Sequence, residues 1–93
     1  MTGKQNFQRE ESFEANNLQG EGNYLILFND DVHDFDFVIK SLVEICGHSN
    51  VQAEQCTYLV HYKGKCDVKK GNYLELKSMQ EELVDRGLQA ALQ

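Results

Sequence analysis

Two carboxylates and an amide stand together at Asn29-Asp30-Asp31, and a histidine, His33, follows two positions later. The run comes directly after an apolar stretch and before a helical pattern, so it sits where a strand gives way to a helix. Such a junction is held on both sides, which is what a binding site needs. A purely local interpretation is also open, because Asn and Asp are common in turns and helix caps.

His61 is the other candidate for chemistry, near the end of a predicted helix. Its local interpretation is a favourable contact with the helix dipole. A metal site built from Asp30, Asp31, His33 and His61 would make the protein a small metal-assisted hydrolase, but these spacings match no common zinc pattern. No nucleophile elbow, phosphate loop or dinucleotide fingerprint is present, so we expect no catalytic residues, no metal and no cofactor.

The three cysteines form neither a disulfide framework nor a zinc motif, because their number is odd and no CxxC pair occurs. Cys46 and Cys56 fall in apolar helical patterns and are expected in the core. No base is placed beside Cys66, so a catalytic thiol is not expected there. His48 lies between two predicted helices and is expected in solvent.

The elements that would position these residues follow from hydrophobic periodicity. Tyr24–Phe28 predicts a buried strand, and apolar residues at three- and four-residue spacing predict a helix from about Asp34 to Cys46. The remaining predictions are a helix over 50–62, a strand over 65–70, a third helix that begins after Asn72 and ends at Arg86-Gly87, and a strand over 88–92.

This βααβαβ order does not alternate regularly, so the expected class is α+β: a three-stranded antiparallel sheet packed against three helices. We expect one small domain over residues 21–93, preceded by a polar, flexible tail over residues 1–20.

The composition excludes several classes of protein. A net charge of −6 argues against nucleic-acid binding. The only basic cluster is interpreted as a solvated strand edge rather than an anion site, and comprises Lys63, Lys65, Lys69 and Lys70. No apolar run approaches the roughly 18 residues of a membrane helix, and the N-terminus lacks the features of a signal peptide. The expected location is therefore the cytoplasm, with no membrane contact.

Three motifs in fixed order resemble the ClpS family: Leu25–Asp31 (LILFNDD), Phe37–Ile39 (FVI) and Val60–Lys65 (VHYKGK). The resemblance covers about residues 23–93. It implies an adaptor that binds the N-terminal residue of a substrate protein, an N-degron with a large hydrophobic side chain such as Leu or Phe. It also implies delivery of that substrate to the N-terminal domain of a Clp AAA+ unfoldase, ClpA- or ClpC-like.

The same resemblance implies the roles of particular residues. Asn29, Asp30 and His61 would grip the substrate's α-amino group. The pocket for its first side chain would comprise Asp31, His33, Phe35, Val38, Thr57, Val60 and Leu88. Glu75 and Lys77 would face the unfoldase, a weaker match because the alignment there needs a short deletion.

Four positions depart from the family's usual pattern: His33-Asp34 replaces Thr-Pro, Phe35 stands where Met or a smaller aliphatic residue is usual, and Thr57 stands where Met is common. These departures affect the side-chain preference more than the general site. Besides the hydrolase, the remaining alternative is a ClpS-like interaction domain that has lost amino-acid recognition.

Overall fold

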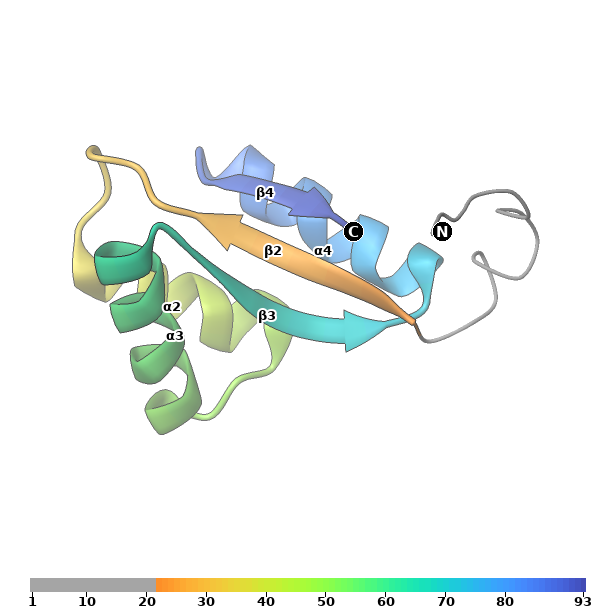
Figure 1. Ribbon diagram of the computed structural model, residues 1–93, viewed down its shortest axis with the longest axis horizontal. Coiled ribbons are helices and arrows are strands. Elements are labelled where there is room, and N and C mark those ends of the chain that lie inside the picture. The colour runs from red at the N-terminus through yellow and green to blue at the C-terminus, as the bar shows by residue number, and fades with distance from the viewer. Residues whose placement is uncertain (1–21) are drawn as a thin grey trace.

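The computed structural model describes residues 22–93, so the tail expected over residues 1–20 lies outside the described residues. The elements follow the predicted order (Figure 1): β2 (Asn23–Phe28), α2 (Phe35–Cys46), α3 (Asn50–Lys63), β3 (Lys65–Gly71), α4 (Tyr73–Asp85) and β4 (Gln89–Leu92). The predicted boundaries hold to within one or two residues, because capping and glycine signals mark most of them.

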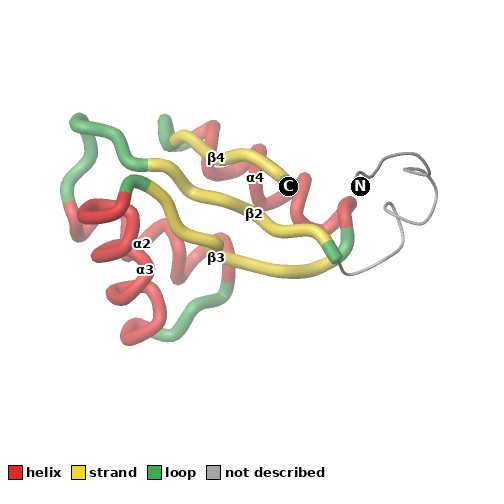
Figure 2. The backbone as a smooth tube through the Cα atoms, viewed as in Figure 1, coloured by secondary structure: helices red, strands yellow, loops and turns green. Residues whose placement is uncertain are grey.

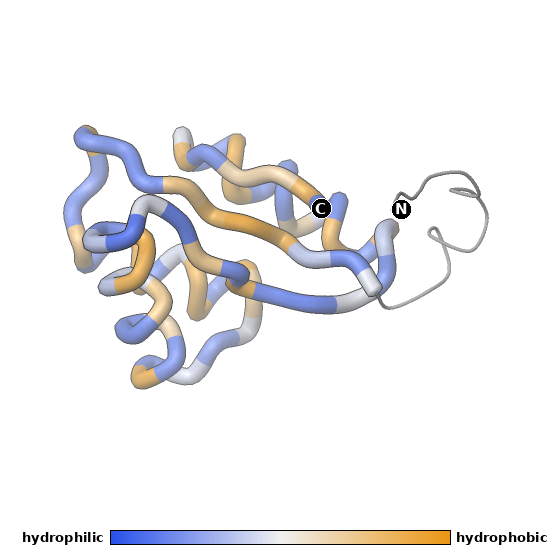
Figure 3. Tube along the Cα trace, in the orientation of Figure 1, coloured by the Kyte–Doolittle hydropathy of each residue, from blue (hydrophilic) through white to orange (hydrophobic). Residues whose placement is uncertain are grey.

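The sheet has the order β3-β2-β4, with both neighbours antiparallel to the central strand. The α+β prediction of a three-stranded antiparallel sheet with three helices is therefore confirmed. Figure 3 shows why β2 is central: its middle is hydrophobic, whereas β3 is largely hydrophilic. Lys65, Lys69 and Lys70 lie on this edge strand, as expected. Lys63 instead ends α3, and Lys69 is partly buried, with its Nζ donating to the carbonyl of Cys46 at 3.1 Å.

Each helix begins at a side chain that accepts a hydrogen bond from the backbone N–H three residues later. The caps are Asp34, Ser49 and Asn72. Gly47 (φ 72°) and Gly64 (φ 92°) end α2 and α3 in the left-handed conformation that glycine adopts without strain. Local chemistry thus sets the helix limits, and Figure 2 shows the long loop that remains between β2 and α2.

The core lies between the sheet and the helices, where Leu25, Leu27, Leu42, Leu76 and Leu83 are almost completely buried. All three cysteines are buried there too. Burial raises the pKa of the Cys46 thiol to about 11 and that of the Cys66 thiol to about 12. Thiols so hard to ionise are poor nucleophiles, in keeping with structural roles. No helix among the described residues is long and apolar enough to cross a membrane.

The expectation for His48 was wrong: its side chain is buried, with 4% of the residue exposed. Its Nε2 donates a hydrogen bond to the carbonyl oxygen of Val68, at 2.6 Å. Val68 is the extra residue of a β-bulge, since Leu25 pairs with Lys69 and Ile26 with Asp67. The bulge takes Val68 out of the ladder, and His48 supplies a donor to its buried carbonyl.

We predict that His48→Ala lowers the free energy of unfolding by about 1–3 kcal/mol, because the Val68 carbonyl would be left buried without this donor. Urea denaturation of both proteins measures the difference. His61→Ala, at an exposed histidine, is the control and should lower it by less. If both variants lose the same unfolding free energy, the buried hydrogen bond from His48 to Val68 does not stabilise the fold.

Candidate functional site

The site forms where β2 ends, because both neighbouring strands start there. Phe28 pairs with Lys65 of β3 and with Gln89 of β4. The next residue, Asn29, donates its backbone N–H to the carbonyl of Gly64, the cap of α3, at 3.0 Å. The polar loop after β2 is thereby tied to the last turn of α3, the turn that carries His61.

The turn between α4 and β4 reaches the same end of the sheet. Gly87 adopts φ 88°, and the following residue, Leu88, donates its N–H to the carbonyl of Leu83 at 3.0 Å. This reversal places Leu88, which is 3% exposed, directly before β4. Residues far apart in the chain therefore meet at one place.

A pocket of about 240 Å³ opens there. Every residue predicted for the amino-group site and the side-chain pocket lines it: Asn29, Asp30, Asp31, His33, Phe35, Val38, Thr57, Val60, His61 and Leu88. The structure thus brings the whole predicted set together, while the role of each residue stays a prediction.

The inner walls are apolar. Val38, Val60 and Leu88 are all less than a tenth exposed. Thr57 is also buried, and its hydroxyl donates to the carbonyl of Ala53 at 2.7 Å, inside its own helix. That hydroxyl is therefore occupied as a donor, and Thr57 does not make this wall markedly polar.

The rim is polar, with Asn29, Asp31 and His61 exposed and Asp30 half-buried. One oxygen of Asp30, Oδ1, accepts the backbone N–H groups of Val32 at 2.8 Å and His33 at 2.9 Å. These hydrogen bonds hold the carboxylate in one orientation at the mouth of the pocket.

The electrostatics of Asp30 follow from the same contacts. Its partial burial works to raise the pKa of the carboxyl, but the N–H groups of His33 and Val32 and the His33 imidazole together lower it by more. The pKa therefore lies below the ordinary value of 3.8. At neutral pH the rim carries a fixed negative charge, suited to a cation.

His33 has a supporting position as well as a place in the lining. Its Nδ1 lies 3.2 Å from both carboxylate oxygens of Asp30, and its ring stacks on Phe37 with centroids 4.9 Å apart. A Cβ added to Gly87 would come within 3.1 Å of the ring. The histidine is thus wedged between α2 and the α4–β4 turn, and it braces Asp30.

Phe35 is half-buried in the first turn of α2 and lines the pocket. Its ring meets Tyr58 edge to face at 4.8 Å and His61 at 5.8 Å. The phenyl group therefore connects the start of α2 to the end of α3.

Three lining residues were not predicted: Leu27, Phe28 and Asp34. Leu27 and Phe28 immediately precede Asn29, so closeness to the motif could have identified them. Asp34 was predicted only as the approximate start of the first helix; its side chain caps α2, and the residue also lines the pocket.

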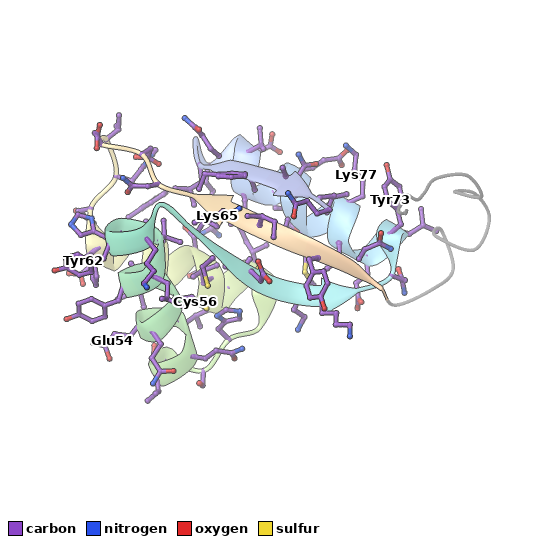
Figure 4. The ribbon with its side chains drawn as sticks, in the orientation of Figure 1. Glu54, Cys56, Tyr62, Lys65, Tyr73 and Lys77 are labelled. Atoms are coloured by element: carbon purple, nitrogen blue, oxygen red, sulfur yellow. The ribbon has the colours of Figure 1, made fainter. Side chains whose placement is uncertain are left out.

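Glu75 and Lys77, predicted to face a partner, do not line the pocket. Both lie on α4, where Glu75 is exposed and Lys77 is hydrogen-bonded to Gln80 at 3.2 Å. Figure 4 shows Lys77 well away from Tyr62 of α3. They belong to a different surface from the pocket.

The residues named for a metal-assisted hydrolase do not form a ligand set. Within residues 22–93, no three His, Cys, Asp or Glu side chains are grouped so that they could hold a metal ion. Instead, Asp30 and His33 are bonded to each other. The geometry does not support that alternative.

Comparison with known proteins agrees with the fold. The family model described as ATP-dependent Clp protease adaptor protein ClpS matches residues 20–91. Among solved structures, the chain is similar to Agrobacterium tumefaciens ClpS2 bound to L-phenylalaninamide. The TM-score is 0.73 at 19% sequence identity, over 76% of this chain and 93% of that chain. No curated protein matches.

We predict that Asp30 contributes to the acid dependence of stability. Because its pKa is lower in the folded state, the ionised carboxylate stabilises the fold at pH values above about 4. This contribution is lost as the pH falls through the folded-state pKa. The difference in unfolding free energy between wild type and Asp30→Asn should therefore be full at neutral pH and shrink below pH ~4.

Urea denaturation at several pH values measures that difference, with Asp31→Asn as a control for the loss of one exposed carboxylate. A difference that stays constant from neutral to strongly acidic pH would contradict the assignment.

Proposed function

Because this chain belongs to the ClpS family, which comprises adaptors of the ATP-dependent Clp protease rather than enzymes, we propose that it binds N-degrons. It recognises the first residue of a substrate protein and delivers that protein to a Clp AAA+ unfoldase. The observation that carries the proposal is the convergence of Asn29, Asp30 and His61 at the mouth of an apolar pocket.

The rim suits a free peptide N-terminus. An α-ammonium group is a small cation with three hydrogen-bond donors, and it needs acceptors that converge on it. The Asn29 amide oxygen, the Asp30 carboxylate and a neutral His61 imidazole provide them. Asp30 is charged and already oriented by Val32 and His33, so little ordering is needed when the peptide binds.

The inner pocket suits the first side chain. Val38, Val60 and Leu88 provide apolar walls, and burial of a Leu or Phe side chain contributes roughly 1.5–3 kcal/mol. That ClpS2 is bound to L-phenylalaninamide, an amino-acid derivative with a free amino group and an aromatic side chain, supports this ligand class. The charge of the peptide's amino group and the shape of its first side chain are then recognised together.

Delivery needs a second surface. Glu75 and Lys77 lie on α4, outside the pocket lining, so substrate and unfoldase can occupy the adaptor together. We propose that they contact the N-terminal domain of a ClpA- or ClpC-like unfoldase, in the cytoplasm.

The test of the amino-group site uses short peptides that begin with Leu, with a free or an acetylated N-terminus. Acetylation removes the charge and should abolish binding to the wild-type protein. Asp30→Ala should weaken binding of the free peptide by about 2–5 kcal/mol, the usual loss when one partner of a buried charge pair is truncated. Isothermal titration calorimetry measures both effects.

Asp36→Ala is the matched control and should retain the affinity, because Asp36 is exposed in the first turn of α2 and does not line the pocket. Thermal unfolding of Asp30→Ala checks that the loop change leaves the domain folded. Equal affinity for the acetylated and free peptides would refute the proposed function.

A separate prediction concerns the side chain of the peptide's first residue. A phenyl ring at the pocket mouth adapts less than Met, which has more rotatable bonds, and overpacking costs about 1–3 kcal/mol. Peptides that begin with Ile or Val, which carry bulk at Cβ, should bind more weakly than those that begin with Leu or Phe. Phe35→Ala should admit Ile and Val, as affinities for the four peptides would show. If wild type already binds Ile as well as Leu, Phe35 does not restrict the mouth.

A further inference from the structure

Four aromatic rings form a closed circuit beside the pocket. Phe35 meets Tyr58 edge to face at 4.8 Å, and Tyr58 stacks on Tyr62 at 5.8 Å and 10°. Tyr62 then meets His61 edge to face at 4.8 Å, and His61 returns to Phe35 at 5.8 Å. Each ring therefore touches two others.

The circuit is divided between the pocket and the surface outside it. Phe35 and His61 line the pocket, whereas Tyr58 and Tyr62 do not. The two tyrosines are 49% and 73% exposed, so burial alone does not account for their arrangement. They are four residues apart on α3, the spacing at which helical side chains lie over one another.

We propose that Tyr58 is a specificity-determining positioning residue, which holds the Phe35 ring across the pocket mouth. The inference rests on the proposed function and adds to it: Tyr58 touches no substrate and acts through Phe35. A phenylalanine in the first turn of a helix has more than one staggered rotamer. The edge-to-face contact with Tyr58 favours one of them.

The geometry also ties the mouth of the pocket to the amino-group site. Phe35 meets both Tyr58 and His61 edge to face, so its ring is in contact with a residue of the proposed amino-group site as well as with Tyr58. A ring held from two sides resists displacement by a side chain with bulk at Cβ. Tyr58 thereby strengthens the preference for a first residue that is not branched at Cβ.

The test compares wild type with Tyr58→Leu, which keeps an apolar side chain but removes the ring. The readout is the ratio of affinities for two peptides that differ only in beginning with Leu or Ile. Loss of one aromatic pair should reduce the preference for Leu by about two- to tenfold. Tyr58→Phe, which keeps the ring, should retain the wild-type ratio.

Tyr73→Leu is the matched control, since it removes a tyrosine at the start of α4. Figure 4 shows Tyr73 and Tyr62 at opposite ends of the molecule, so this variant should also keep the wild-type ratio. The decisive comparison is made in the Phe35→Ala background. In that background Tyr58→Leu should not change the ratio of affinities for the Leu and Ile peptides, because the Phe35 ring through which Tyr58 acts has been removed.

The outcomes separate this inference from the proposed function. A wild type that prefers Leu, with the same preference in Tyr58→Leu, would overturn the inference alone. So would an equal loss of affinity for both peptides, which indicates a merely structural role. A wild type that binds neither peptide would overturn the proposed function, and the inference with it.

Discussion

The pairing of the last residue of the central strand with both of its neighbours is the constraint on which the site depends. Phe28 faces Lys65 on one side and Gln89 on the other. Antiparallel pairing means that β3 and β4 both begin where β2 ends. The end of α3 and the turn after α4 are therefore delivered to the loop that follows β2. His61 and Leu88 reach Asn29 and Asp30 by this route, and the hydrogen bond from Asn29 to Gly64 closes the arrangement.

The Asp30 loop combines charge with rigidity. Its carboxylate takes hydrogen bonds from two backbone N–H groups and from the His33 ring, so the cost of partial burial is more than offset and the ionised form is favoured. His33 itself is held by Phe37 and by the close approach of Gly87. A side chain at Gly87 would both strain a positive φ and press on that ring. One glycine thus helps to orient a carboxylate on another segment of the chain.

The molecule separates three tasks among different surfaces. In the proposed function, apolar walls from α2, α3 and the α4–β4 turn would accept a side chain and the polar rim would accept a cation, while α4 carries the residues proposed to face the unfoldase. The aromatic circuit joins the first two tasks, because Phe35 and His61 belong to both the pocket lining and the circuit. Burial raises the pKa of the Cys46 and Cys66 thiols, in keeping with structural roles in the core.

The sequence by itself determined the order of the elements and their limits, and it predicted most of the residues that line the pocket. Helix caps at Asp34, Ser49 and Asn72, and apolar spacing along each helix, act over three or four residues and can be recognised locally. The site residues were predicted from motifs at matching separations rather than from physics, and the structure then gathered them around one pocket.

Only the tertiary structure decided what depends on partners distant in the chain. His48 is buried because a bulge in β3 leaves the Val68 carbonyl without a ladder partner. His33 braces Asp30 because Gly87 leaves room for its ring, and Phe35 meets Tyr58 because α2 packs beside α3. No periodicity encodes these contacts, since strand register and helix packing are set by the whole fold.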